Sequence, residues 1–297
     1  MTDALLGVLL IVATGLIWAV IGAFFSHVAQ RGLKVLAFGM VMTLCVSFLA
    51  WSLLCHWPAV LHGGLPRARD FVPLMALAGI LNWSGMLLIM AAMRRGHQAG
   101  SWTVSQSAMV VPFLAGIVFW HDRPTTLNMT GAVLILLAVV VFGLRSARHE
   151  PGSQARPWFH IALMAFCIIG VSQTFCTIPS HWAGWSDAGG LRVPVFTSAA
   201  LAFLATACAI RREWPGRREV VAGSLCSLAG LAGNYTFFAG MDLMATRHLV
   251  ALVYPTAIGV CMTAFVLYTR FWGKERLGWG GLAALGLGVA GVALLAV

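Results

Sequence analysis

Long apolar runs separated by short polar connections are the feature that most limits what this sequence can fold into. A helix needs about 20 residues to cross the hydrocarbon core of a bilayer, and only helices or closed barrels satisfy their backbone polar groups there. Cutting the chain at charged residues, Pro and Gly leaves ten runs near that length. They are 4–25, 36–56, 71–92, 99–120, 126–144, 158–179, 192–210, 219–240, 248–270 and 278–297. The sequence therefore predicts an all-α membrane protein with ten transmembrane helices.

The composition supports the same class. Only 9% of the 297 residues are charged, 60% are hydrophobic and the mean hydropathy is +0.88. A soluble domain usually carries about 25% charged residues, because its surface faces water. The first run begins by Leu5 without a preceding basic segment, so we interpret it as a span and not as a cleaved signal.

The net charge of +10 has its origin in short basic clusters between the apolar runs. The nine connections between the runs are numbered in chain order. Fourteen of the nineteen Lys and Arg residues lie in the odd-numbered connections, whereas the even-numbered ones hold five, including Arg192. Positive connections stay on the cytoplasmic side. We therefore expect a multi-pass protein of a bacterial cytoplasmic (inner) membrane with both termini in the periplasm. This distribution does not indicate nucleic-acid binding.

The third and eighth runs are similar to each other. Superposing ALAGILNWSGMLLIMAAMRRG on SLAGLAGNYTFFAGMDLMATRH at an offset of 152 places Asn82 on Asn234 and Trp83 on Tyr235. An offset close to half the chain favours internal duplication, which is common in transporters.

Five spans in each half is an odd number, so the second copy must be inverted relative to the first. The prediction is a 5+5 inverted repeat, with residues 1–145 as the first repeat, 146–157 as the central loop and 158–297 as the second repeat. Such repeats alternate between two open states around a site near the midplane of the membrane.

One segment resembles a known family. The residues SWTVSQSAMVVPFLAGIVF (101–119) and the following HDRPTTLNMTGAVLILLAVVVF resemble the drug/metabolite transporter (DMT) superfamily of EamA-like proteins. Within that superfamily the segment is most similar to the rhamnose and glucose/ribose uptake branches. The resemblance implies a ten-helix transporter whose spans one to four and six to nine line the cavity. It implies no cofactor.

Amide side chains within apolar runs are the first candidates for solute binding: Asn82, Gln106, Gln173 and Asn234. An amide offers two donors and an acceptor, which suits the hydroxyl groups of an uncharged polar solute. The alternative is that they join helices, for about 0.6 kcal/mol each.

Aromatic side chains near these amides suit stacking against the apolar face of a sugar. The candidates are Trp18, Trp83, Trp102, Tyr235 and Tyr254. The alternative for several of the twelve Trp residues is anchoring at the membrane interface, where many of them stand at span ends.

No Asp or Glu stands in the central part of a span, which argues against a charged substrate and against an acid-driven exchanger. Candidates for proton coupling are His27, His97, His248 and Asp242, near span ends. The alternatives are that the histidines are solvated or capping residues, and that the carrier is passive.

Together these features predict a secondary transporter that moves a small uncharged polar metabolite, with a monosaccharide as the first candidate, by alternating access and possible proton symport. The alternative is an exporter of amino acids or related metabolites on the same fold. Paired carboxylates, a Ser/His pair and a metal-ligand cluster are all lacking in the sequence pattern, so we expect neither an enzyme nor a metal site. We expect a monomer or homodimer in the lipid bilayer, with the solute and protons as small partners.

Overall fold

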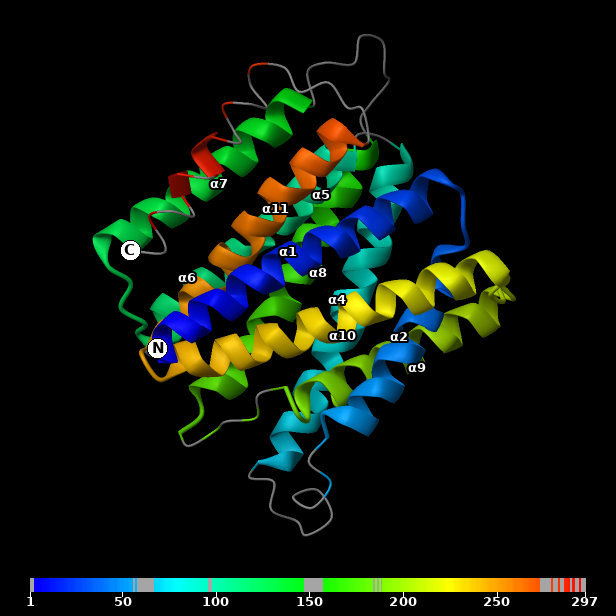
Figure 1. Cartoon of the computed structure of the whole chain (residues 1–297), viewed down its shortest axis with the longest axis horizontal. Coiled ribbons are helices and arrows are strands. Elements are labelled where there is room, and N and C mark those ends of the chain that lie inside the picture. The colour runs from blue at the N-terminus through cyan, green and yellow to red at the C-terminus, as the bar shows by residue number, and fades with distance from the viewer. Residues whose placement is uncertain are drawn as a thin grey trace.

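The computed structural model describes residues 3–55, 57, 67–95, 98–146, 157–183, 185, 187, 189–272 and isolated positions between 279 and 294. The described residues form helices joined by short connections, and they include no strand (Figure 1). Most of the central loop (146–157) and of the expected tenth span (278–297) lies outside the described residues, and so does His97.

Each of the first nine expected spans has a helical counterpart. The α-helices are α1 (Asp3–Gln30), α2 (Val35–Leu53), α4 (Ala68–Arg95), α5 (Gln98–Gln106), α6 (Val110–Trp120), α7 (Thr126–Ser146), α8 (Pro157–Thr177), α9 (Arg192–Arg211), α10 (Arg217–Ala245) and α11 (Val253–Phe271). Three short 3-10 segments accompany them: η1 (Ser107–Met109), η2 (Ile178–His181) and η3 (Val250–Leu252).

Eight helical segments of the described chain, 19 to 29 residues long, are apolar enough to cross a bilayer. A further apolar helix is α7, in which the described residues include the apolar segment Thr126–Ala138. Large apolar side chains such as Phe48, Phe119 and Leu228 point outward, as expected where lipid and not water surrounds the bundle. The chain is a multi-pass membrane protein.

The fourth and ninth spans are interrupted by 3-10 segments. The fourth breaks in its middle, at η1, and Pro112 follows three residues after that segment. The ninth breaks at its beginning, at η3, and Pro255 follows at the same distance. Proline lacks a backbone N–H and its ring clashes with the preceding turn, so a tighter or irregular turn before it is expected.

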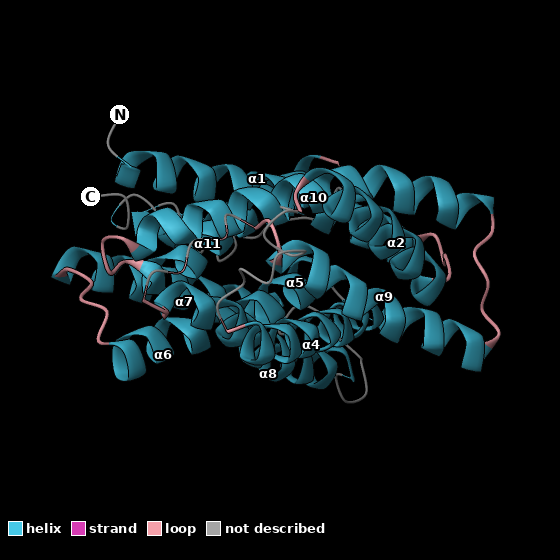
Figure 2. Ribbon diagram, turned by 90° about the horizontal axis from the view of Figure 1, so that it is seen from below, coloured by secondary structure: helices cyan, strands magenta, loops and turns pink. Residues whose placement is uncertain are grey.

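Glycines bring the long helices into close contact. α1 packs along α10 and α11, and α4 packs along α8 and α9, whereas α2 contacts α9 and α10. Gly240 of α10 faces Ile11, and Gly15 of α1 faces the carbonyl of Ala257. Figure 2 shows α1, α10 and α11 on one side of the molecule and α4 and α8 on the other.

Candidate functional site

A cavity lies between these two groups of helices. Its empty volume, counting its open mouth, is about 900 Å³. Its walls come from α1, α2, α4, α5, α8, α9, α10 and α11, whereas α7 contributes none of the lining residues. Thr43 and Asn82 stand close to the middle of α2 and α4, which places the cavity near the mid-depth of the bundle.

Eight of the nine residues that the sequence nominated for substrate binding line this single cavity. They are Trp18, Asn82, Trp83, Trp102, Gln106, Gln173, Asn234 and Tyr254. The ninth, Tyr235, is not among the lining residues and its exposed fraction is 42%. Because successive helical residues point about 100° apart, the neighbour of an inward-facing Asn234 turns toward the outside of the bundle.

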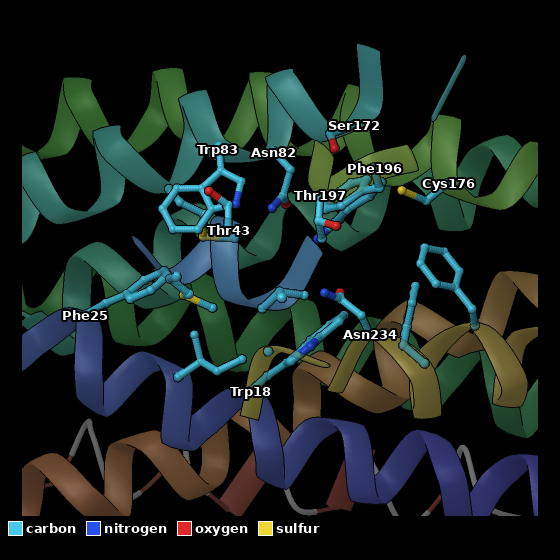
Figure 3. A pocket seen from close by; sticks show the side chains of 18 of the residues that line it. Trp18, Phe25, Thr43, Asn82, Trp83, Ser172, Cys176, Phe196, Thr197 and Asn234 are labelled. Atoms are coloured by element: carbon cyan, nitrogen blue, oxygen red, sulfur yellow. The ribbon is translucent and has the colours of Figure 1, made fainter. Parts of the chain in front are cut away.

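The amides converge without bonding to the protein. Figure 3 shows the side chains of Asn82 and Asn234 reaching into the same space from opposite walls. Neither they nor Gln106 or Gln173 make a side-chain hydrogen bond within the described part of the chain. The Gln173 Oε1 atom is also buried and has no hydrogen-bond donor among the described residues. An unpaired buried acceptor is costly, and a solute hydroxyl would satisfy it.

Aromatic rings form much of the remaining wall. Trp18 packs on Phe237 with ring centroids 4.9 Å apart, and Phe237 packs on Tyr254 at 4.8 Å. On the opposite side Trp83 lies 6.0 Å from Phe25. These rings support one another, so their positions are fixed before a solute arrives.

Three hydroxyl residues in the lining had no part in the sequence-based prediction: Thr43, Ser172 and Thr197. Each donates its proton to a backbone carbonyl, Thr43 to Gly39 at 2.9 Å and Ser172 to Ala78 at 2.8 Å. Their oxygens are left as acceptors toward the cavity. A signal did exist for two of them, because Thr43 and Thr197 are 154 residues apart, close to the repeat offset.

A buried charge cluster stands behind the cavity wall. Arg192, the first residue of α9, has an exposed fraction of 0% and forms a salt bridge with Asp242. Its Nε atom lies 3.4 Å from Asp187 Oδ2, and its guanidinium lies 5.1 Å from the centre of the Phe238 ring, which lines the cavity. Burial raises the pKa of Asp187, against the opposing effect of the Arg192 charge.

This cluster corrects the interpretation of Arg192 as a connection charge facing water. The local sequence does not reveal its burial, because its partner Asp242 is fifty residues further along the chain. Asp242 also accepts hydrogen bonds from Ser180 and from the backbone N–H of Asp187, at 3.0 Å each. The positive charge is thus neutralised within the wall, and every described residue that lines the cavity is uncharged.

None of the described candidates for proton coupling lines the cavity. His27 is exposed on the outside of α1, and His248 is exposed in the connection after α10, with a left-handed backbone (φ 57°). Asp242 belongs to the charge cluster. His97 lies outside the described residues.

Asp122, just beyond α6, is a further titratable group that the sequence did not nominate. Its carboxylate accepts a hydrogen bond from the backbone N–H of Ala251 at 2.8 Å and so joins the end of α6 to η3. Burial raises the pKa of Asp122 to about 6, although this hydrogen bond and the nearby His248 oppose the shift.

No protein-family model and no curated protein matches this sequence. Among solved structures, 22 chains match significantly. One crystal structure has a TM-score of 0.69 and 16% sequence identity, with 98% of each chain covered. At this identity the likeness establishes the fold alone, and it extends over nearly the whole length of both chains.

Proposed function

We propose that this chain is a secondary transporter that carries a small uncharged polar metabolite through the mid-bundle cavity by alternating access. The observation that carries the proposal is the convergence of four unbonded amides with aromatic rings in one cavity walled by both halves of the chain. Amides bind hydroxyls, and rings cover the apolar face of a sugar, so a monosaccharide is the first substrate that we propose.

Alternating access in this proposal rests on two inverted repeats of five helices. The packing supports it. The first spans of the two halves are α1 and α8, and the third spans are α4 and α10. Exchanging the halves therefore turns the α1–α10 contact into the α8–α4 contact, and both contacts are present. Two pairs of cavity residues, Asn82 with Asn234 and Trp102 with Tyr254, share the offset of 152. Membership of the DMT superfamily is part of the same proposal and rests on the resemblance of the segment from Ser107 to Phe142, whereas residues 101–119 point to its sugar-uptake branches.

The substrate that we propose is uncharged, because the described lining holds no charged group. A buried charge without a partner costs several kcal/mol, so a charged solute would need a counter-ion in the wall. The charge of Arg192, which lies against the ring of the cavity-lining Phe238, is already shared with Asp242 and Asp187.

Counterflow tests this function directly. Proteoliposomes loaded with unlabelled monosaccharide should accumulate the labelled sugar, whereas protein-free liposomes should not. Rhamnose, glucose and ribose form the first panel, and serine and threonine serve as amino-acid comparisons. Amino-acid exchange without sugar exchange would replace the sugar by an amino acid on the same fold, and exchange of none of these solutes would leave the cavity without its proposed role.

We further propose a bacterial cytoplasmic membrane, with the arginine-rich connections in the cytoplasm and both termini in the periplasm. The burial of Arg192 supports this orientation, because it removes one positive charge from the connections assigned to the opposite side. Proton coupling stays a proposal for His27, His97, His248 and Asp242, as does the absence of enzymatic activity.

A further inference from the structure

A second groove lies on the outside of the bundle, between α1, α10 and α11, and is separate from the central cavity. Its empty volume is about 1480 Å³, including its open side. α1 contributes Val20, Ala23, Phe24 and His27, and Arg31 follows directly after its last residue. The spacing of these residues places them on one face of the helix.

α10 supplies the opposite wall with a matching pattern. Arg217 and Arg218 stand at its first turn, and Val221, Ala222 and Leu225 follow one and two turns later on the same face. Tyr268 of α11 lines the groove as well. Both walls therefore have an apolar part that leads to a cationic end.

The dimensions of this groove match one leaflet of a membrane. With a rise of 1.5 Å per residue, the distance along α1 from Val20 to Arg31 is about 16 Å. Half of a hydrocarbon core that is about 30 Å thick has nearly the same depth. The apolar part of the groove can thus lie along an acyl chain while the arginines reach the headgroup region.

The arginines are not paired with acidic side chains of the protein. Within the described residues, Arg31, Arg217 and Arg218 have no carboxylate within 4 Å, and all three are exposed. The nearest acidic residue in sequence, Glu219, is buried and accepts hydrogen bonds from the backbone N–H groups of Lys34 and Gly216. The groove therefore presents a net positive charge at one end only.

We propose that this groove binds an anionic glycerophospholipid, with the headgroup phosphate at Arg31, Arg217 and Arg218 and an acyl chain between α1 and α10. Arginine forks fit phosphate oxygens, and basic pockets between membrane helices suit anionic headgroups. Tyr268, in the last turn of α11, also lines the groove, and tyrosine is favoured at membrane interfaces. The proposal needs only that the chain spans a membrane, so it does not depend on the transport function.

Native mass spectrometry of the full-length protein in an uncharged detergent tests the site. Dioleoylphosphatidylglycerol should bind to the protein at least about tenfold more tightly than dioleoylphosphatidylcholine, because only the first carries net charge. The triple variant Arg31→Gln/Arg217→Gln/Arg218→Gln should lose that preference. Inorganic phosphate at millimolar concentration should not displace the lipid.

The matched control removes the same charge elsewhere at the same end of the bundle. Arg211, Arg212 and Arg270 are exposed there and do not line the groove. Their triple Gln variant should bind phosphatidylglycerol within about twofold of the wild type. Equal losses in both triple variants would mean that general charge and not the groove attracts the lipid, and displacement by phosphate would mean a site for the free anion.

A second variant keeps all the charges and fills the apolar part. Val221 is half exposed within the groove, so Val221→Trp should exclude the acyl chain with little effect on the core. Its phosphatidylglycerol affinity should fall at least about tenfold. Wild-type affinity in this variant, measured on protein that still elutes as a single species, overturns the proposal even if the arginine variant fails to fold.

Discussion

At the scale of single residues, the two matched pairs of an asparagine and an aromatic residue contribute to the cavity in different ways. Asn234 faces the cavity and Tyr235 faces outward, and the corresponding pair on α4, Asn82 and Trp83, both line it. The helix geometry explains the difference on α10, whereas on α4 the bulky indole of Trp83 extends far enough to reach the cavity from a less direct angle (Figure 3).

Replacement of either asparagine should weaken solute binding without unfolding the protein. One hydrogen bond to an uncharged group is worth about 1 kcal/mol, and 1.4 kcal/mol is a factor of ten. We expect Asn82→Ala and Asn234→Ala each to raise the Kd for the transported sugar by about five- to tenfold. Tyr235→Ala is the matched control and should leave the Kd unchanged; equal effects of all three variants in a binding titration would contradict this assignment.

Removal of Arg192 should destabilise the fold. Its loss leaves Asp242 and Asp187 buried without their cation, and breaking a buried ion pair typically costs about 3–5 kcal/mol. We expect Arg192→Met to lower the Tm by many degrees in a detergent-based thermal unfolding assay. Arg211→Met, at the exposed end of the same helix, should leave the Tm nearly unchanged.

Asp122 should make stability depend on pH between about 4 and 6. Its pKa is raised from the ordinary 3.8 to about 6, so the folded state binds this proton more readily than the unfolded state. The corresponding stabilisation is complete below about pH 3.8 and is lost as the pH rises through about 6. Asp122→Asn should remove this part of the pH dependence of the Tm, and an identical profile for wild type and variant would contradict it.

At the scale of helices, close approach at glycine decides where the cavity wall stands. A Cβ atom at Gly79 of α4 would lie 2.1 Å from the backbone carbonyl oxygen of Phe196 in α9. Phe196 and Thr197 line the cavity, so separating these two helices moves its wall. Small residues at helix contacts are how membrane helices approach closely enough to gain dispersion energy.

Gly79→Ala should therefore reduce both stability and solute binding. Overpacking of a core typically costs about 1–3 kcal/mol, and backbone, unlike a side chain, cannot turn aside. A Cβ atom at Gly286 would meet none of the described residues within 4 Å, so Gly286→Ala is the control. Thermal unfolding and ligand titration of the two variants should differ clearly, and a wild-type Tm for Gly79→Ala would mean that the α4–α9 contact adapts.

At the scale of the whole molecule, the number of spans decides on which side of the membrane the C-terminus lies. Eight span-length helical segments and the apolar helix α7 lie in the described residues, and the sequence predicts one more span at 278–297. Ten spans place the C-terminus on the same side as the N-terminus. A C-terminal alkaline phosphatase fusion should therefore be active in the periplasm; activity of a cytoplasmic reporter at that end, with none of the phosphatase, would indicate an odd number of spans or the opposite orientation.

The sequence by itself determined the class of protein and the positions of nine helical spans. Hydropathy and the bilayer thickness are properties of one segment at a time, so no tertiary information is needed to find a span. The observed helix ends differ from the expected span ends by several residues. For example, α1 extends to Gln30, five residues past the expected end of the first span at 25. Pro112 and Pro255 are local causes of the breaks at η1 and η3, because proline acts within its own turn.

Only the tertiary structure decided which residues share the cavity and which charges are buried. Lipid is as apolar as a protein core, so hydropathy does not tell an inward face from an outward one. Hydropathy therefore does not separate the outward-facing Tyr235 from Asn234, and it does not identify Thr43 and Thr197, although both line the cavity. The burial of Arg192 depends on Asp242, fifty residues away in sequence, and such a contact exists only once α9 and α10 are packed together.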